Sequence, residues 1–429
     1  MKISTIFRSS LLKSSLIYTF CDAINKAVPF LILPFLSYYL APSDYGIIAN
    51  FNVLLAIVSI FIMLGVDGAI GVNYYKFNKA EMSRYIFNGV LLTLFTTGTV
   101  LIIFLLFHQF IYEFVKVPQR YLVLLVVMAF ATSMTSINLS LWRLEEQPVK
   151  FGIYEILQTI VNIGVSLIFV VSYKMGWVGR VNGMLIASLS FGIFSLIILY
   201  RRGYLKLNID RVYLRDILYF GLPLIPHALS FWIRSGIDRI YITTFIGESD
   251  TGLYATGFQF GVLVSFLTLS FNNAFAPYLF KSLSTEDPAQ LYDNKLKLVK
   301  ITYYGIAVLM ITCLLFTLCS NFILTHFFSE QYIKAKEFVF WAILSQTFQG
   351  MYLLFVNYIF FVKRTKALAT ITFFCACLQL ILSYFVIKQF GAIGGAYSTV
   401  IISFVNFILV AYLSNRVYNM PWTKFLSSK

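Results

Sequence analysis

Residues 217–246 read ILYFGLPLIPHALSFWIRSGIDRIYITTFI, and the class of fold can be predicted from them. It is mostly apolar, and it is longer than the about 20 residues with which an α-helix crosses the hydrocarbon core of a membrane. Two prolines and four ionisable residues interrupt the apolar pattern: Pro223, Pro226, His227, Arg234, Asp238 and Arg239. Because ionisable side chains are costly inside a membrane, the stretch predicts a spanning helix with a functional role.

The composition of the whole chain agrees with this interpretation. Of 429 residues, 59% are hydrophobic and 12% are charged, whereas soluble domains carry about 25% charged residues. The 28 Tyr and 44 Phe suit membrane interfaces. The five cysteines lie in apolar runs and indicate neither a metal site nor a disulfide framework. We read the apolar N-terminal stretch as a retained first span rather than a signal peptide, because it is too long and contains charges.

The same length criterion predicts twelve spans in two sets of six. We place them near residues 14–39, 46–66, 86–108, 120–143, 151–173, 178–200, 217–246, 252–278, 298–320, 337–361, 367–387 and 392–415. The expected domains are an N-terminal six-helix lobe over 1–200, a basic cytoplasmic linker over 201–216 and a C-terminal six-helix lobe over 217–429.

The distribution of positive charge predicts the orientation. With both termini in the cytoplasm, 23 of the 33 Lys and Arg residues fall on that side, 7 fall on the other side and 3 lie within spans. This bias satisfies the positive-inside rule. It also accounts for the net charge of +15 without nucleic-acid binding.

An internal repeat supports two equivalent halves. Ser43-Asp44-Tyr45-Gly46 recurs as Ser249-Asp250-Thr251-Gly252 after the first span of each half. Gly176-Trp177-Val178-Gly179 is echoed by Gly391-Ala392-Ile393-Gly394 before the last span of each half. Six spans per half give both halves the same orientation, which is typical of transporters that bind their substrate between two lobes.

The ionisable residues within spans are the candidate site: Asp22, Lys26, Glu155, His227, Arg234, Asp238 and Arg239. On a helix, His227, Arg234 and Asp238 fall within roughly 20° of one stripe. We expect Lys26 and Arg234 to lie near the membrane midplane and to attract a diphosphate. Alternatively, Asp22–Lys26 and Arg234–Asp238 are neutralising pairs that only lock helices. His227 has a role either in proton coupling or in structure. Glu155 either faces the substrate cavity or only helps to lock helices.

Prolines occupy corresponding spans of the two halves. Pro29 and Pro34 interrupt the first predicted span, and Pro223 and Pro226 interrupt the seventh. Helix breaks in such positions point to a transport site, although bent packing helices are the alternative. Polar residues recur in two further spans, where they suit a hydrated lumen for sugars or hydrogen bonds between helices: Glu155, Gln158, Asn162, Gln346, Gln349 and Asn357.

The chain lacks the motifs of several enzyme classes. It contains no G-x-x-x-x-G-K-[ST] phosphate loop, no H-E-x-x-H and no G-x-S-x-G. Its predicted outer loops are short, which leaves little room for a catalytic domain. Both observations favour a transporter over an enzyme.

Four sequence markers in this order carry a family resemblance. They are Leu40-Ala-Pro-Ser-Asp-Tyr-Gly46, Phe220-Gly-Leu-Pro-Leu-Ile-Pro226, Asp238-Arg239 with Gly252-Leu-Tyr-Ala255, and Phe390-Gly-Ala-Ile-Gly-Gly-Ala396. With these markers the chain resembles the Wzx-type O-antigen flippases of the multidrug/oligosaccharidyl-lipid/polysaccharide exporter superfamily. The resemblance implies a MATE-like all-α fold with a central cavity and an alternating-access carrier of undecaprenyl-diphosphate-linked oligosaccharide in the bacterial inner membrane.

By the same resemblance, Lys26, Arg234 and Arg239 would line the cavity without any cofactor. Asp22 and Asp238 depart from a strongly cationic lumen, so proton or sodium coupling is an alternative use for these carboxylates. Glycan-assembly proteins are expected partners. Three rival functions remain: a multidrug antiporter of the same superfamily, an O-antigen polymerase or ligase, and a scaffold that does not transport.

Overall fold

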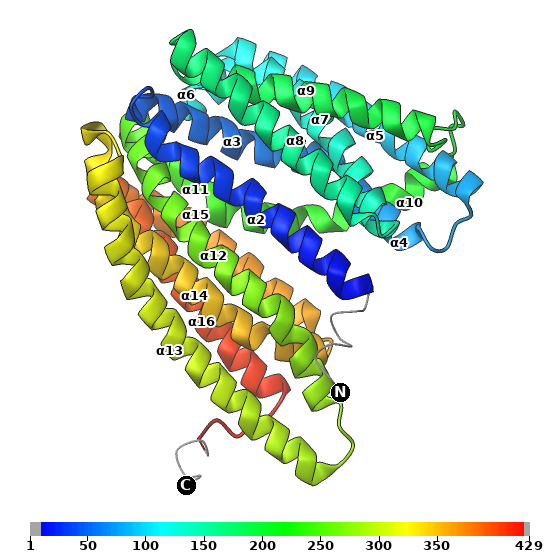
Figure 1. Ribbon diagram of the computed structural model, residues 1–429, viewed down its shortest axis with the longest axis vertical. Coiled ribbons are helices and arrows are strands. Elements are labelled where there is room, and N and C mark those ends of the chain that lie inside the picture. The colour runs from blue at the N-terminus through cyan, green and yellow to red at the C-terminus, as the bar shows by residue number, and fades with distance from the viewer. Residues whose placement is uncertain (1–9, 424–429) are drawn as a thin grey trace. The chain divides into compact units, whose positions relative to one another are not determined.

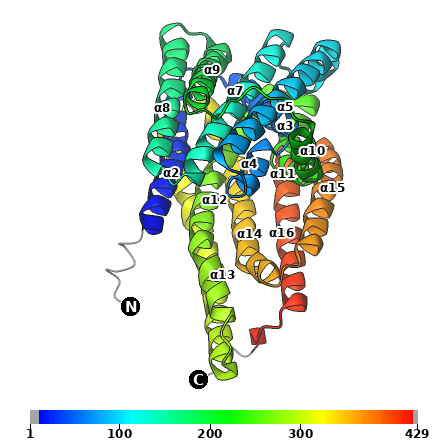
Figure 2. The ribbon, with the colours of Figure 1, turned by 90° about the vertical axis from the view of Figure 1, so that its right-hand side faces the viewer.

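The computed structural model describes residues 10–423, and in that range the chain folds into helices without a strand (Figures 1 and 2). Eleven helical segments in this part of the chain are long and apolar enough to cross a membrane. The predicted all-α, multi-pass membrane fold is therefore confirmed.

The helices follow one another through short connections. In chain order they are α2 (Ser10–Leu36), α3 (Pro42–Met63), α4 (Val66–Asn73), α5 (Lys79–Leu106), α6 (His108–Val115), α7 (Gln119–Leu144), α8 (Pro148–Leu167), the π-helical turn η1 (Ile168–Ser172), α9 (Gly176–Arg201), α10 (Arg211–Gly221), the 3-10 turn η2 (Leu222–Leu224), α11 (Ile225–Phe245), α12 (Glu248–Leu283), α13 (Pro288–Phe327), the 3-10 turn η3 (Glu330–Ala335), α14 (Lys336–Phe361), α15 (Thr365–Phe390) and α16 (Ala392–Val417).

Eleven of the twelve predicted spans correspond to these long apolar segments. The predicted first span corresponds to α2, where the stretch that meets the apolar criterion is only Ala23–Leu36. Some helices are longer than a membrane requires. At 1.5 Å per residue, α13 with 40 residues is about 60 Å long, so it extends beyond the hydrocarbon core.

The chain forms two compact units. Unit 1 comprises the chain up to Trp232 together with Gly247–Gly252, and unit 2 comprises Ile233–Ile246 and the chain from Leu253 onwards. The first turns of α11 and α12 thus belong to unit 1, and the rest of both helices belongs to unit 2. The predicted lobe boundaries around 201–216 stay a prediction.

Side-chain caps determine where several helices start. The Asn78 side chain accepts a hydrogen bond from the backbone N–H of Glu81, and the Glu81 carboxylate accepts one from the N–H of Asn78. The carboxylates of Asp210 and Asp287 accept bonds from Val212 and Ala289 at the starts of α10 and α13. Each cap satisfies a backbone donor that has no partner within its own helix.

The repeated Ser-Asp-x-Gly motifs meet each other in unit 1. A Cβ atom built on Gly46 would lie 1.9 Å from the carbonyl oxygen of Glu248, and one built on Gly252 would lie 1.8 Å from that of Pro42. The first turns of α3 and α12 can therefore cross at backbone contact only because both positions are glycine.

Asp44 of the same motif joins a second predicted marker. Its Oδ2 accepts a hydrogen bond from Ala41 N at 3.1 Å, and its Oδ1 accepts one from Trp177 N at 3.4 Å. The repeat motifs found in the sequence are thus structural junctions between helix ends.

A similar glycine contact lies at the far end of α3. Gly65, with φ of +70°, faces the Cα of Gly221, and a Cβ on Gly221 would lie 1.7 Å from the Leu64 carbonyl oxygen. The positive φ at Gly65 is readily available only to glycine. This contact connects the α3–α4 junction to the end of α10.

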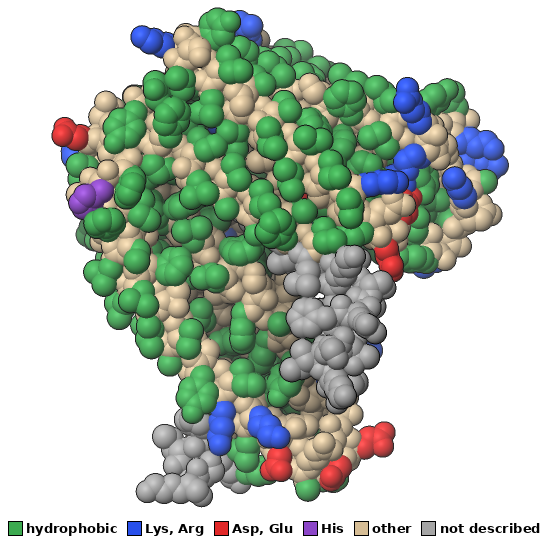
Figure 3. Space-filling model, in the orientation of Figure 1, with side chains coloured by type: hydrophobic (Ala, Val, Ile, Leu, Met, Phe, Trp, Pro, Cys, Tyr) green, Lys and Arg blue, Asp and Glu red, His purple; other side chains and the backbone are tan. Residues whose placement is uncertain are grey.

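Large apolar side chains remain exposed along the helices, as expected of surfaces that face lipid. Only 11% of the most apolar 18-residue stretch of α13 is buried, whereas 61% of the corresponding stretch of α7 is buried. Figure 3 shows hydrophobic side chains spread over the face in view. In unit 2, α14 and α16 pack along each other and α15 packs on α16 (Figure 2).

Candidate functional site

Unit 1 contains a polar pocket between α4, α7 and α8, with a volume of about 300 Å³. Leu139 is the one apolar side chain among the nine that line it. The other eight are polar or charged: Asp67, Thr132, Thr135, Ser136, Ser140, Arg143, Glu155 and Gln158. Such a concentration of polar groups is costly between apolar spans unless water or a ligand solvates it.

The predicted residue Glu155 lies at this pocket and also connects α8 to α2. Its Oε2 accepts a hydrogen bond of 2.9 Å from Nδ2 of Asn25. Thr159 donates to Asn25 Oδ1 at 2.7 Å. The amide of Asn25 therefore joins both α8 side chains, which orients the Glu155 carboxylate.

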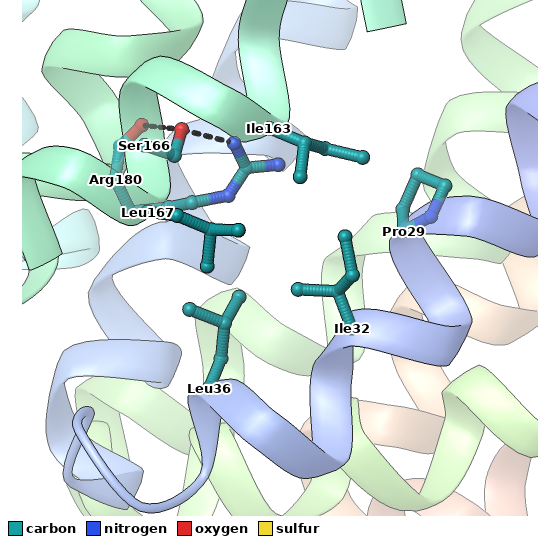
Figure 4. A pocket seen from close by; sticks show the side chains of 7 residues that line it. All are labelled: Pro29, Ile32, Leu36, Ile163, Ser166, Leu167 and Arg180. Atoms are coloured by element: carbon teal, nitrogen blue, oxygen red, sulfur yellow. Dashed lines mark hydrogen bonds between the residues drawn. The ribbon is translucent and has the colours of Figure 1, made fainter. Parts of the chain in front are cut away.

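Arg180 lies in the first turns of α9, and its side chain points inward. Its Nη1 donates to Ser166 Oγ at 2.7 Å and to Asn162 Oδ1. The guanidinium borders a pocket of about 20 Å³, room for one water molecule, whose other walls are Ser166 and apolar side chains of α2 and α8 (Figure 4). The positive charge thus lies between α2, α8 and α9.

Asp238 is the central polar residue of unit 2, and its side chain is 5% exposed. Gln379 Nε2 donates to both carboxylate oxygens, at 3.0 and 3.1 Å. Thr399 Oγ1 donates to Oδ2 at 2.6 Å, and Tyr254 Oη donates to the same oxygen at 3.2 Å. Helices α11, α12, α15 and α16 therefore meet at one carboxylate that is held by uncharged donors.

The network around Asp238 continues through hydroxyl groups. The Gln379 amide also donates to Ser383 Oγ at 2.8 Å, and the Ser383 hydroxyl donates to Ser398 Oγ at 3.0 Å. Gly395 lets α16 approach, since a Cβ there would lie 3.5 Å from the Cβ of Asp238.

Arg234 has a neutral partner in unit 2. Its Nη2 donates to Gln349 Oε1 of α14 at 2.9 Å. The predicted neutralising pair with Asp238 is not formed, and in residues 10–423 the ion pair between side chains is that of Arg202 with Glu145. The reason is competition: Gln379, Thr399 and Tyr254 occupy the carboxylate oxygens of Asp238.

The ion pair of Arg202 with Glu145 lies where α9 leads into the linker. Tyr204 donates to the same Glu145 oxygen at 2.7 Å. Burial and then this hydrogen bond raise the pKa of Tyr204 above its usual value. The linker is therefore attached to the end of α7.

The remaining predicted residues of α11 do not share one environment. His227 is exposed, and its ring contacts Phe231 at 5.0 Å between centroids. Arg239 donates to the Ser235 carbonyl oxygen of its own helix. The predicted stripe thus runs from an exposed His227 to a buried Asp238.

The side chains of Asp22 and Lys26 lie outside the described part of α2, so their proposed pairing stays a prediction.

The four prolines differ in effect. Helix α2 continues through Pro29 and Pro34, in contrast to the expected interruption. A proline removes one hydrogen bond, and the bonds of the flanking turns keep the helix continuous here. At Pro223 the helix changes to the 3-10 turn η2.

Sequence reasoning missed Gln379, Thr399 and Tyr254 as partners of Asp238. The available signal was a helical run of polar positions in otherwise apolar spans: Gln379 and Ser383 lie one turn apart, as do Gly395 and Thr399.

Within residues 10–423, no group of three or more His, Cys, Asp or Glu side chains is arranged to hold a metal ion.

Comparisons with known proteins agree with this architecture. A model of the family described as polysaccharide biosynthesis protein matches residues 35–337. A membrane protein of Haemophilus influenzae is 28% identical over 394 residues, which is 90% of each chain.

Two solved structures share the fold. An inward-facing multidrug resistance MATE family transporter of the MOP superfamily has a TM-score of 0.71 at 18% identity and covers 94% of both chains. The lipid II flippase MurJ, in an inward closed conformation, has a TM-score of 0.72 at 13% identity and covers 96% of this chain and 89% of its own. The predicted MATE-like architecture is therefore confirmed at the level of the fold.

Proposed function

Because this chain belongs to the polysaccharide biosynthesis protein family, we propose that it is a flippase for a lipid-linked oligosaccharide. Its substrate is an undecaprenyl-diphosphate-linked repeat unit of O-antigen or a related surface polysaccharide. The protein resides in the bacterial inner membrane with both termini in the cytoplasm, and it moves the headgroup outward by alternating access. The reaction is transport, without a change in covalent bonds.

The environment of Arg234 carries this proposal. A guanidinium in the middle of a membrane helix needs a counter-charge, and here it donates a hydrogen bond to the neutral amide of Gln349. Its charge therefore remains available for a diphosphate, which guanidinium binds with a planar pair of donors. We assign Lys26 and Arg239 to the same binding role.

Asp238 provides the coupling site of the proposed cycle. Four hydrogen bonds from uncharged donors hold this carboxylate in unit 2. Such a carboxylate can exchange a proton or a sodium ion as the transporter changes conformation. Asp22, Glu155 and His227 are further coupling candidates, and no other cofactor is required.

The test compares a deletion strain with strains complemented by variants. Deletion should remove surface glycan and trap completed lipid-linked oligosaccharide in the cytoplasmic leaflet. Normal glycan together with a change in sensitivity to cationic drugs would instead identify a multidrug antiporter, a function favoured by the fold shared with the MATE transporter.

At the level of the site, we predict that Arg234→Ala lowers glycan export by about tenfold to a hundredfold. This range corresponds to the about 1.5–3 kcal/mol of a hydrogen bond to a charged group. Arg234→Lys should retain part of the export, because it keeps the charge but loses the planar donors. Export is measured as surface glycan per unit of membrane-inserted protein.

Arg364→Ala is the matched control, because Arg364 is an exposed residue between α14 and α15. It should export normally. A well-inserted Arg234→Ala protein with undiminished export would exclude Arg234 from substrate binding.

A further inference from the structure

The polar pocket of unit 1 contains more hydrogen-bonding groups than the protein uses. The hydroxyls of Thr132 and Thr135 donate to backbone carbonyls of their own helix. In the part of the chain that the structure describes, the side chains of Ser136, Ser140 and Gln158 form no hydrogen bond with the protein, although all three line the pocket. Groups of this kind, converging on one space, are typical of a site that receives a polar ligand.

The charges around the pocket restrict the chemistry of that ligand. Asp67 and Glu155 contribute two carboxylates. Arg143 contributes one guanidinium, whose Cζ lies over the ring of Phe151 at 5.0 Å from the ring centroid. This set of charged groups repels a diphosphate. It suits a ligand with many hydroxyls, because carboxylates accept hydrogen bonds from hydroxyls and serine and amide groups both donate and accept.

The position and size of the pocket agree with a sugar ring. Its lining extends along α7 from Thr132, at the middle of the helix, to Arg143, in the last turn. Its volume of about 300 Å³ is at the lower end of the range for small-molecule sites. The pocket therefore reaches from the last turn of α7 to the middle of that helix, with room for a single ring.

We propose that this pocket binds a neutral sugar residue of the transported glycan, while the diphosphate is held elsewhere, by Arg234. The inference rests on the proposed flippase function and adds which chemical part of the substrate unit 1 recognises. Acidic sugars are excluded by Asp67 and Glu155.

Saturation-transfer difference NMR on the purified full-length protein tests the proposal, because the method detects weak binding of free sugars. The probes are galactose, rhamnose and N-acetylglucosamine as neutral sugars, and glucuronic acid as the acidic one. The double variant Ser136→Leu with Ser140→Leu fills the pocket with apolar side chains. We expect it to reduce the signal of the neutral sugar that binds best by at least fivefold.

Thr99→Leu is the matched control, since Thr99 is exposed on α5 and bonds only to the Phe95 carbonyl of its own helix. It should leave the signal unchanged. The charge argument has its own variant, Glu155→Gln, which should increase binding of glucuronic acid relative to the neutral sugars.

Three results would overturn the proposal. They are no signal from any neutral sugar, a signal from the double variant Ser136→Leu with Ser140→Leu (the filled variant) equal to that of the unmodified protein, and stronger binding of glucuronic acid than of neutral sugars by the unmodified protein. The deletion strain reports separately on the flippase function. Loss of surface glycan on deletion, with undiminished sugar binding by the filled variant, would remove the sugar site and leave the flippase intact.

Discussion

At the scale of single residues, two charged side chains on one helix have separate partners. Arg234 and Asp238 are one helical turn apart, yet Arg234 bonds to Gln349 and Asp238 bonds to Gln379, Thr399 and Tyr254. Since each charge has its own neutral partners, neither is cancelled by the other. The guanidinium and the carboxylate can therefore act in different steps of transport.

Substitution of Asp238 tests the coupling role. Asp238→Asn replaces an acceptor with a group that also donates, so that donors of Gln379 and Thr399 lose a partner and the carboxylate charge is lost. We expect transport in proteoliposomes to lose its dependence on a proton or sodium gradient while the protein still inserts. Asp293→Asn, at an exposed position of α13, should keep the dependence. A gradient response of normal size in Asp238→Asn would assign coupling to another residue.

At the scale of helices, close crossings depend on glycine rather than on large apolar side chains. The first turns of α3 and α12 cross at Gly46 and Gly252, and the α3–α4 junction meets the end of α10 at Gly65 and Gly221. Backbone atoms cannot move aside as a flexible side chain can, so the crossings tolerate no Cβ at their present distance. The ends of α3 are thereby held at two points.

Replacement of Gly46 tests this packing. Gly46→Ala would place a methyl group 1.9 Å from the carbonyl oxygen of Glu248, so α12 must shift at a cost of about 1–3 kcal/mol. We expect a lower melting temperature of the purified protein. Gly98→Ala has nothing within 4 Å of the added methyl group and should be neutral or stabilising, because alanine favours the helix. Equal melting temperatures for both variants would contradict the tight crossing.

At the scale of the whole molecule, the orientation of the spans follows from charge and can be measured at the two ends of α12. Ser249 lies in the first turn of this helix, Ser284 follows its last residue, and both are exposed. We predict that Ser249→Cys reacts with a membrane-impermeant thiol reagent in intact spheroplasts, whereas Ser284→Cys reacts only after permeabilisation. The native protein is the control for background labelling. The reverse pattern would invert the topology.

The sequence predicts the spans well and the site less completely, for a physical reason. About 20 consecutive apolar residues are a local property, so each span can be recognised without knowledge of its neighbours. The partners of Asp238 are 141 and 161 residues away for Gln379 and Thr399, and only the packing of four helices brings them together. For the same reason, Glu155 could be recognised as a candidate, whereas its pocket with Asp67 could not.

The contact between Gly46 and Gly252 also bears on how the protein is made. Unit 1 is not a continuous piece of chain, because it includes Gly247–Gly252, so the ribosome must have passed residue 252 before this unit has all its parts. A nascent chain released after the linker would leave the Gly46 surface without the backbone that covers it. Two-fragment expression should therefore divide the gene after α12, in the segment 284–287, rather than at the basic linker.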